Sequence, residues 1–347
     1  MKISTAPAAA RLPWLTLALE AAGGTFTWAL DDPPGSGPHL HLWAPGEADW
    51  LWRIIGEQAH AATLRDLTSR HDIDVPVSAP AELALLYRLA WGHWLRRWWP
   101  ASAADGIDPL PALVLDAEVA ALTADCEMYF GDTGFDGDPN AVLGAYDDAD
   151  IAALALHPRP DVRDLHARLR EFDTGEQEPV PAASGDPGDY ALAAGPGTAT
   201  ESGGGIARGL ASVPWESVPA HTFDAAENTI AWSVDAAPDV VADVTVALLP
   251  GRTAAPVRVA LSLHDPAFEA QATLAPDGRL PIPLPLTATE AWGADWSALV
   301  VTVGGVDARD SREQREQVRA LVRERIEGGT GLTGLFVAEQ IVADNAY

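Results

Sequence analysis

The chain has 347 residues, of which 48% are hydrophobic, and a formal net charge of −28. The length predicts two domains, and the apolar content excludes a disordered chain. The negative charge disfavours direct contact with nucleic acid phosphates and with anionic lipid headgroups. The single cysteine, Cys126, excludes an intrachain disulfide and favours a cytoplasmic location. The sequence contains no uninterrupted run of about 18 apolar residues, so it predicts no membrane span.

Arginine supplies almost all of the positive charge. Lys2 is the only lysine among the 22 basic residues, and the chain contains 30 glycines and 28 prolines. This composition is typical of a bacterium with a GC-rich genome, and it indicates an origin rather than a mechanism.

The first 70 residues predict short, mixed elements. Residues 12–22 are expected to form a short helix. Residues 25–30 and 39–43 alternate in polarity on either side of a Pro- and Gly-rich turn, which predicts a small β-hairpin. One or two helices are expected within residues 47–70.

Two longer helices follow. The first begins at Pro80, carries Glu82 in its first turn and ends before Pro100, as helix-end preferences require. The second runs from about residue 111 to residue 130, and Cys126 lies on its apolar stripe, so we expect a buried thiol with a raised pKa. Shorter helices are expected at 141–156 and 161–172.

Residues 174–206 are rich in Gly, Pro, Ala and Ser, which predicts a linker. Short strands are then expected, with a hairpin-type turn at residues 276–279 and an edge strand at 280–284, where prolines interrupt hydrogen bonding. Such short strands with frequent turns are typical of a β-sandwich. The strands are expected at residues 229–234, 244–249, 257–263, 270–274, 280–284 and 298–303.

The chain returns to helix near its end, because Ser311 and Gln314 fit a capping box and Gly328 marks a stop. The predicted fold class is therefore α+β. Its parts are a mainly helical acidic domain with a small β-hairpin (1–173), a linker (174–206), a β-sandwich-like domain (207–308), and a C-terminal helix and tail (309–347).

The acidic residues are unevenly distributed. Between Arg97 and Arg159 there is no lysine or arginine, whereas twelve aspartates and glutamates fall in that stretch. Their mutual repulsion must be offset by solvent, by arginines from elsewhere, by a cation or by a basic partner.

A loop inside this stretch has the residue types of a divalent-cation site. The candidate ligands are Asp132, Asp136, Asp138 and Asn140. The spacing loosely follows a calcium loop, but Ala141 stands where that loop needs glycine. A single Asp-Thr-Gly tripeptide at 132–134 also occurs in aspartic proteases, which require two such carboxylates. A plain turn explains the same residues.

Two other patterns bear on function. His39 and His41 are two residues apart on a predicted strand, so they share a face and could bind one metal ion or simply lie at the surface. In the helix at 80–98, Trp94 and Trp98 fall on the apolar stripe and are expected in the core. Trp91 and the following Trp99 are candidates for a partner surface. The acidic candidates for that surface are Asp116, Glu118, Asp147, Asp148 and Asp150.

No catalytic motif is present, which favours a non-catalytic accessory or adaptor protein of a bacterial multi-protein system. It would bind a partner with a basic surface through the acidic, Trp-rich helical region, with the tail from Leu335 as a docking segment. One alternative is a metal-dependent hydrolase using the loop at 132–140 and a divalent cation. Another is an acidic mimic that occupies a basic nucleic-acid-binding site on a partner.

Overall fold

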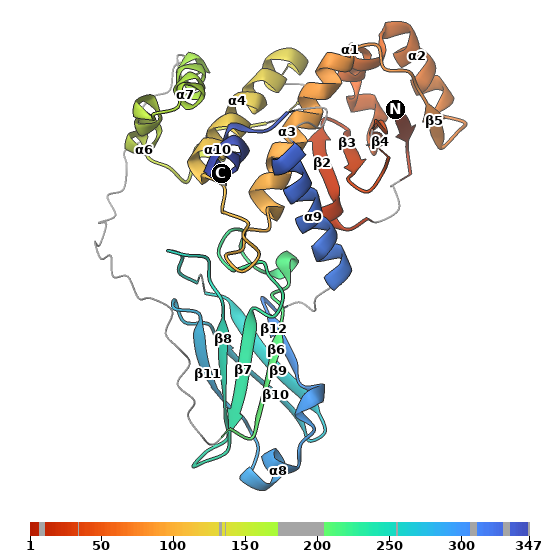
Figure 1. Cartoon of the computed structure of the whole chain (residues 1–347). Helices are drawn as coiled ribbons and strands as arrows, with labels where there is room; N and C mark the ends of the chain where they lie inside the picture. Colours follow the sequence, from red (N-terminus) through yellow and green to blue (C-terminus); the bar gives the residue numbers. More distant parts are fainter. Residues whose placement is uncertain are drawn as a thin grey trace, which may run out of the picture.

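The structure is a computed structural model that describes residues 1–6, 11–33, 35–131, 134–135, 137–172, 205–254, 256–305, 311–328 and 334–345. It combines helices with three β-sheets and is of the α+β class (Figure 1). The predicted linker at 174–206 lies almost wholly outside the described residues.

A five-stranded sheet occupies the N-terminal part, in the order β2-β3-β4-β1-β5. The predicted hairpin is confirmed, because β3 and β4 pair in antiparallel register. The sheet is larger than a hairpin because β1 adds in parallel to β4, and β2 and β5 pair at the two edges. The strands are β1 (Lys2–Ser4), β2 (Thr16–Ala21), β3 (Gly24–Ala29), β4 (His39–Leu42) and β5 (Asp72–Asp74).

The helix expected at residues 12–22 is wrong. This segment forms a 3-10 turn at Pro13–Leu15 followed by strand β2. Leu17 and Leu19 are buried, whereas Ala18 and Glu20 are exposed, which is the two-residue period of a strand. The pairing of β2 with β3 outweighs the helical tendency of its alanines and leucines.

The two long predicted helices are confirmed as α3 (Pro80–Trp98) and α4 (Ala112–Phe130). They approach closely at Gly92, where a Cβ atom would lie 2.6 Å from Val119 and 3.1 Å from Phe336. α4 is buried on almost every side, so its apolar surface is wider than the single stripe expected from sequence. The shorter helices are α1 (Trp52–Ile55), α2 (Glu57–Asp66), α5 (Pro139–Leu143), α6 (Asp148–Ala153) and α7 (Pro160–Phe172).

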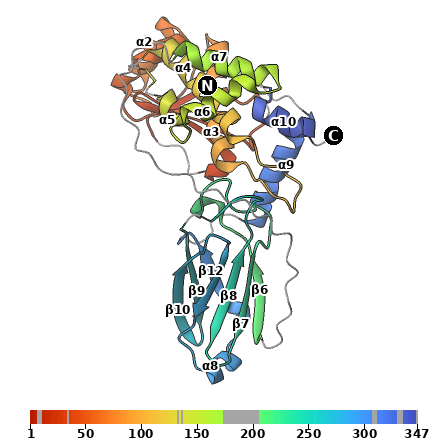
Figure 2. The same cartoon turned by 90° about the vertical axis from the view of Figure 1, so that its left-hand side faces the viewer.

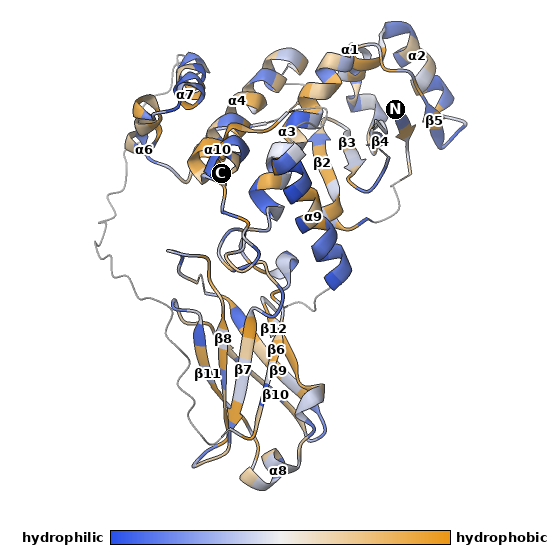
Figure 3. Cartoon of the chain, viewed as in Figure 1, coloured by the Kyte–Doolittle hydropathy of each residue, from blue (hydrophilic) through white to orange (hydrophobic). Residues whose placement is uncertain are grey.

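The C-terminal helices α9 (Arg312–Gly328) and α10 (Val337–Asn345) pack against the N-terminal helices (Figures 1 and 2). Val322 and Phe336 belong to the same hydrophobic cluster as Ile3. The capping box is confirmed, since Ser311 and Gln314 exchange hydrogen bonds. Most of α9 is hydrophilic in Figure 3, yet Arg319 on it is buried. We call residues 1–172 together with α9 and α10 the body.

The part between them, residues 205–305, holds two sheets that share a second hydrophobic cluster, and we call it the β module. One sheet has the order β11-β8-β7-β6 and the other β10-β9-β12. The strands are β6 (Ala207–Ala211), β7 (Ile230–Asp235), β8 (Val241–Val246), β9 (Arg258–His264), β10 (Ala267–Thr273), β11 (Arg279–Pro283) and β12 (Val300–Val303), and a short helix, α8 (Ala288–Gly293), precedes β12.

The six predicted strands are present, and the one expected at 244–249 lies at 241–246. Strand β6 was not predicted. β11 lies at a sheet edge, as its prolines predict. The turn expected at 276–279 is confirmed, with Gly278 at a φ of 78°, but it does not close a hairpin. β10 and β11 join different sheets, because each finds its antiparallel partner elsewhere in the chain.

Body and β module meet at loops that precede β7. The Ala225 N–H donates to the Ala101 carbonyl over 3.0 Å, and the Ala103 N–H donates to the Asp224 carboxylate over 3.0 Å. From the body, Arg97 donates to the carbonyls of Trp215 and Glu216. The two parts are therefore joined by hydrogen bonds as well as by the chain.

Candidate functional site

The outer face of the five-stranded sheet carries short and polar side chains in rows. Strand register places Ser4 beside His41 and His41 beside Thr25. The next row contains Lys2, His39 and Thr27, followed by Ala18 on β2. Because residues two apart share a face of a strand, these rows follow from the alternation of buried and exposed residues.

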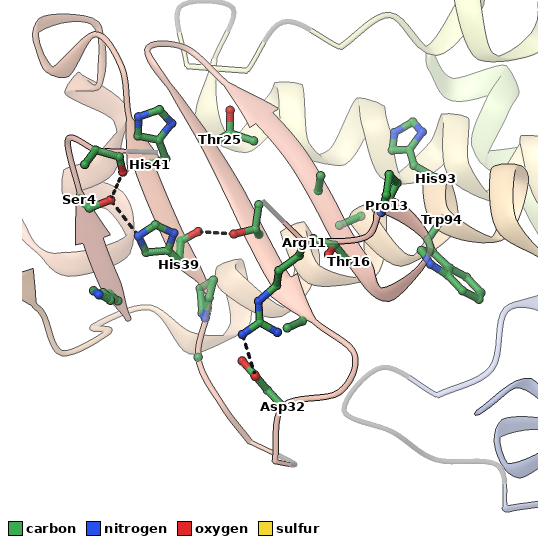
Figure 4. Close-up of a pocket in the computed structure, with 18 of the residues that line it drawn as sticks. Ser4, Arg11, Pro13, Thr16, Thr25, Asp32, His39, His41, His93 and Trp94 are labelled. Carbon is green, nitrogen blue, oxygen red and sulfur yellow. Dashed lines mark hydrogen bonds and ion pairs between the residues drawn. The ribbon is translucent and has the colours of Figure 1, made fainter. Parts of the chain in front are cut away.

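These rows form the floor of a hollow of about 880 Å³. Figure 4 shows Ser4, His39 and His41 toward one end and His93 and Trp94, from helix α3, toward the other. The volume falls within the range of about 300–1,000 Å³ that small-molecule sites occupy. This hollow is the candidate binding site of the body.

Ser4 and His39 lie within hydrogen-bonding distance at 2.8 Å. The Ser4 hydroxyl donates its proton to the Ala6 carbonyl over 2.6 Å, so the His39 Nε2–H must donate to the Ser4 oxygen. A general base needs an unprotonated nitrogen facing the hydroxyl, and this arrangement provides the opposite. Burial, followed by the charge of Lys2, lowers the pKa of His39 and keeps its ring neutral. The pair is therefore suited to binding rather than to nucleophilic attack.

Charged residues at the edge of the hollow are paired. Lys2 contacts the Asp72 carboxylate over 3.1 Å, and Arg11 contacts Asp32 over 3.3 Å. In Figure 4 the Arg11 and Asp32 side chains meet at the margin of the hollow. Each positive charge is matched by a negative one, so the hollow is nearly neutral although the whole chain is strongly acidic.

His93 is the most strongly perturbed histidine of the site. Burial, with a smaller contribution from nearby Arg96, lowers its pKa to about 4. It is therefore neutral at pH 7 and can donate one hydrogen bond and accept another. His93 also lines a second cavity, at the junction with the β module.

The tryptophans proposed as a partner surface are interior residues. Trp91 is 3% exposed, and its ring lies 4.5 Å from the Arg325 guanidinium of α9. Trp99 is 4% exposed and donates a hydrogen bond to the Asp108 carbonyl. Trp94 is buried, as expected. Trp91 is interior because α9, from the C-terminal end of the chain, packs against it.

Two of the acidic candidates are interior as well. Asp116 accepts from Arg96 over 2.6 Å and from the Tyr146 hydroxyl over 2.8 Å. Glu118 contacts Arg88 and accepts the Val337 N–H over 2.7 Å. Arginines from elsewhere therefore neutralise these acids, which was one of the alternatives for the acidic stretch.

The other three acidic candidates lie at the exposed start of α6. Asp147 accepts the Asp150 N–H over 2.9 Å, and Asp150 accepts the Asp147 N–H over 3.2 Å. This is a capping box, and Asp148 adds negative charge to the same helix start. These side chains remain available to solvent, and their contact with a partner stays a prediction.

The predicted metal loop is described only in part. Asp132 and Asp136 lie outside the described residues. Asp138 caps α5 by accepting the Asn140 N–H over 2.8 Å. Within the described ranges, no group of three His, Cys, Asp or Glu side chains is arranged to hold a metal ion. The hydrolase alternative therefore stays a prediction.

Two expectations about single residues have clear outcomes. Cys126 is buried, and burial raises the pKa of its thiol to about 12, as expected. His39 and His41 share a face, as expected, but their neighbours there are Ser4, Lys2 and two threonines. Sequence reasoning missed these neighbours. The alternation in residues 16–29 is a local signal for strands β2 and β3, but no local pattern places β1 beside β4.

Comparisons with protein-family models, with curated proteins and with solved structures found no match to the chain. Within the described residues, no helix has the length and apolar character needed to cross a bilayer.

Proposed function

We propose that this chain is a non-catalytic accessory protein that binds an extended segment of a protein partner in the hollow on the outer face of its five-stranded sheet. The observation that carries this proposal is the floor of short Thr, Ala, Ser and His side chains, opened to about 880 Å³. Such a floor leaves room for a ligand and offers donors and acceptors along its length.

The shape of the polar rows favours an elongated ligand. A row crosses four strands from β1 to β2, which spans about 14 Å at about 4.8 Å per strand. An extended polypeptide covers that distance with about four residues. Neutral imidazoles and threonine oxygens can hydrogen-bond its backbone, and the buried core behind the strands keeps the floor rigid.

The global charge favours a partner with a basic surface. A net charge of −28 accelerates the approach of cationic proteins, and the nearly neutral hollow does not repel them once they arrive. The exposed acids of α6, Asp147, Asp148 and Asp150, are one surface for this attraction. We also propose a cytoplasmic location in a bacterium, and a role for the β module as a sandwich-like spacer or second recognition unit.

The test fills the hollow without disturbing the core. Ala18 lies exposed on the floor, so Ala18→Arg places a long cation inside the hollow. The matched control is Ala152→Arg, on the exposed surface of α6. Affinity capture from the native host, followed by mass spectrometry, is expected to recover one protein with the wild type and the control but not with Ala18→Arg. Equal recovery by both variants contradicts binding in the hollow.

A further inference from the structure

A second cavity, of about 320 Å³, lies where the body meets the β module. Its walls come from the end of α3, the first turn of α4 and the loop before β7. The basic side chains in these walls are His93, Arg96, Arg97 and His221. Burial lowers the pKa of both histidines, so the positive charge in the lining comes from Arg96 and Arg97, with Asp116 as a carboxylate beside them. Arg96, Arg97 and His221 do not line the hollow on the sheet, so partner binding there does not explain this group.

The two guanidiniums keep hydrogen-bond donors unused within the described residues. Arg96 uses Nε for Asp116, whereas no bond from its two Nη atoms is seen. Arg97 uses Nη2 for the carbonyls of Trp215 and Glu216, which leaves Nε and Nη1. A guanidinium presents five N–H donors in a fixed fork that matches phosphate and carboxylate oxygens.

The acid beside these arginines is already neutralised. Both oxygens of Asp116 are occupied, one by Arg96 and the other by the Tyr146 hydroxyl. Burial lowers the pKa of Arg97 and nearby Glu216 opposes that shift, but Glu216 is not among the residues that line the cavity. Two arginines and one carboxylate line the cavity, and that carboxylate already has both oxygens hydrogen-bonded, so the charge of the lining is positive.

The rest of the wall fits a ligand with an anionic group and an apolar part. Leu110, Ala112 and Leu115 line the cavity beside the arginines. α4 starts at Ala112 after Pro111, which provides no side-chain cap, so N–H groups of its first turn add donors to the same wall. A tetrahedral dianion matches several convergent donors better than a monoanion does.

We propose that this cavity binds a phosphate group, either as the free ion or as a phosphate monoester with a small apolar substituent. Because Arg96 and Arg97 belong to the body whereas His221 belongs to the β module, the bound group also strengthens the junction between them. The proposal does not depend on partner binding in the hollow on the sheet, although His93 lines both cavities.

The test measures binding directly, by titration calorimetry at constant ionic strength with inorganic phosphate and with phenyl phosphate. Wild type is expected to bind at least one of them saturably. Tighter binding of phenyl phosphate indicates an organic monoester, whereas equal or tighter binding of inorganic phosphate indicates the free ion. Absence of saturable binding for both compounds overturns the proposal.

Variants at Ala112 locate the site. Ala112 is exposed in the first turn of α4, where an acidic residue suits the helix, so Ala112→Glu is expected to fold while its carboxylate repels the ligand. The matched control, Ala112→Gln, adds similar bulk without charge. We expect Ala112→Glu to weaken binding by about tenfold or more relative to Ala112→Gln. Equal affinity of the two variants overturns the assignment to this cavity.

Thermal melting provides a second check with the same two variants at Ala112. Wild type is expected to melt at a higher temperature when phosphate is added, and this increase should be smaller in Ala112→Glu than in Ala112→Gln. Equal increases in the two variants contradict binding in this cavity.

Discussion

The body and the β module solve the problem of burial differently. The β module is continuous in sequence, from 205 to 305, and its hydrophobic cluster is made of residues within that range. The body joins both ends of the chain and buries charged residues, including Glu339 and Arg319. A large hydrophobic cluster and buried ion pairs hold the body together, whereas the strand pairs of the β module all join residues within 205–305. The comparison shows that some acids of the stretch between Arg97 and Arg159 are buried and paired inside the body, whereas others lie on its surface.

The strongest test of this difference divides the chain. Residues 205–305 expressed alone are expected to fold, because their core is internal. Residues 1–172 alone are expected not to fold cooperatively, because they lack Val318, Val322 and Phe336 and leave Glu118 without the Val337 N–H. Circular dichroism with thermal melting measures both. Co-expression of 1–172 with 205–347 should restore the body, and a cooperative transition in 1–172 alone breaks the comparison.

The next largest effect is expected at the buried pair of α9 and α10. Glu339 is fully buried and accepts from Arg325 over 2.5 Å and from the Phe336 N–H over 2.7 Å. Glu339→Gln leaves a buried guanidinium without its counter-charge, which should lower the free energy of unfolding by about 3–5 kcal/mol. Urea denaturation measures the change. Glu269→Gln, on an exposed position of β10, is the control and should change stability by less than about 0.5 kcal/mol.

A matched pair of glycines tests packing in the two parts. In the body, Gly92→Ala places a Cβ atom 2.6 Å from Val119, and this overpacking should cost about 1–3 kcal/mol. In the β module, Gly293 ends α8 with nothing within 4 Å of the added Cβ. Gly293→Ala should be neutral or stabilise by up to about 1 kcal/mol. Equal effects at both positions would show that the close contact between α3 and α4 is not tight.

The smallest effect concerns pH and the boundary between the two parts. The folded pKa of His93 is about 4, below the ordinary 6.5, so the unfolded chain binds the proton more readily. Its contribution to stability is full above pH 6.5 and decreases as the pH falls toward 4. Between pH 7 and pH 5 this loss is about 2 kcal/mol. We expect His93→Gln to lose correspondingly less stability than wild type over that interval, as measured by urea denaturation. Identical pH profiles would contradict a buried, neutral His93.

Local patterns predicted much of the fold. The boundaries of α3 followed from Pro80 and Pro100, and the capping box of α9 followed from Ser311 and Gln314. β2 was missed because its leucines and alanines suit a helix, and only its pairing with β3 decides otherwise. The edge position of β11 was predicted because proline removes a hydrogen-bond donor wherever the strand lies.

The candidate site was predictable only in part. The shared face of His39 and His41 follows from the period of a strand. Their neighbours Ser4 and Lys2 arrive through a parallel pairing of β1 with β4, across more than 30 residues of chain. In the same way, the sequence shows only that Glu118 is an acid on a helix. Its burial depends on contacts with Arg88 and with the Val337 N–H at the start of α10.

The sequence by itself determined the acidity of the chain, the buried Cys126, the two long helices and the strand-rich region after residue 206, because these depend on composition and on the period of neighbouring residues. Only the tertiary structure decided which acids are buried, which strands share a sheet, and that α9 and α10 complete the body. Burial and ion pairing join residues that are distant in the chain, and no local period records those contacts.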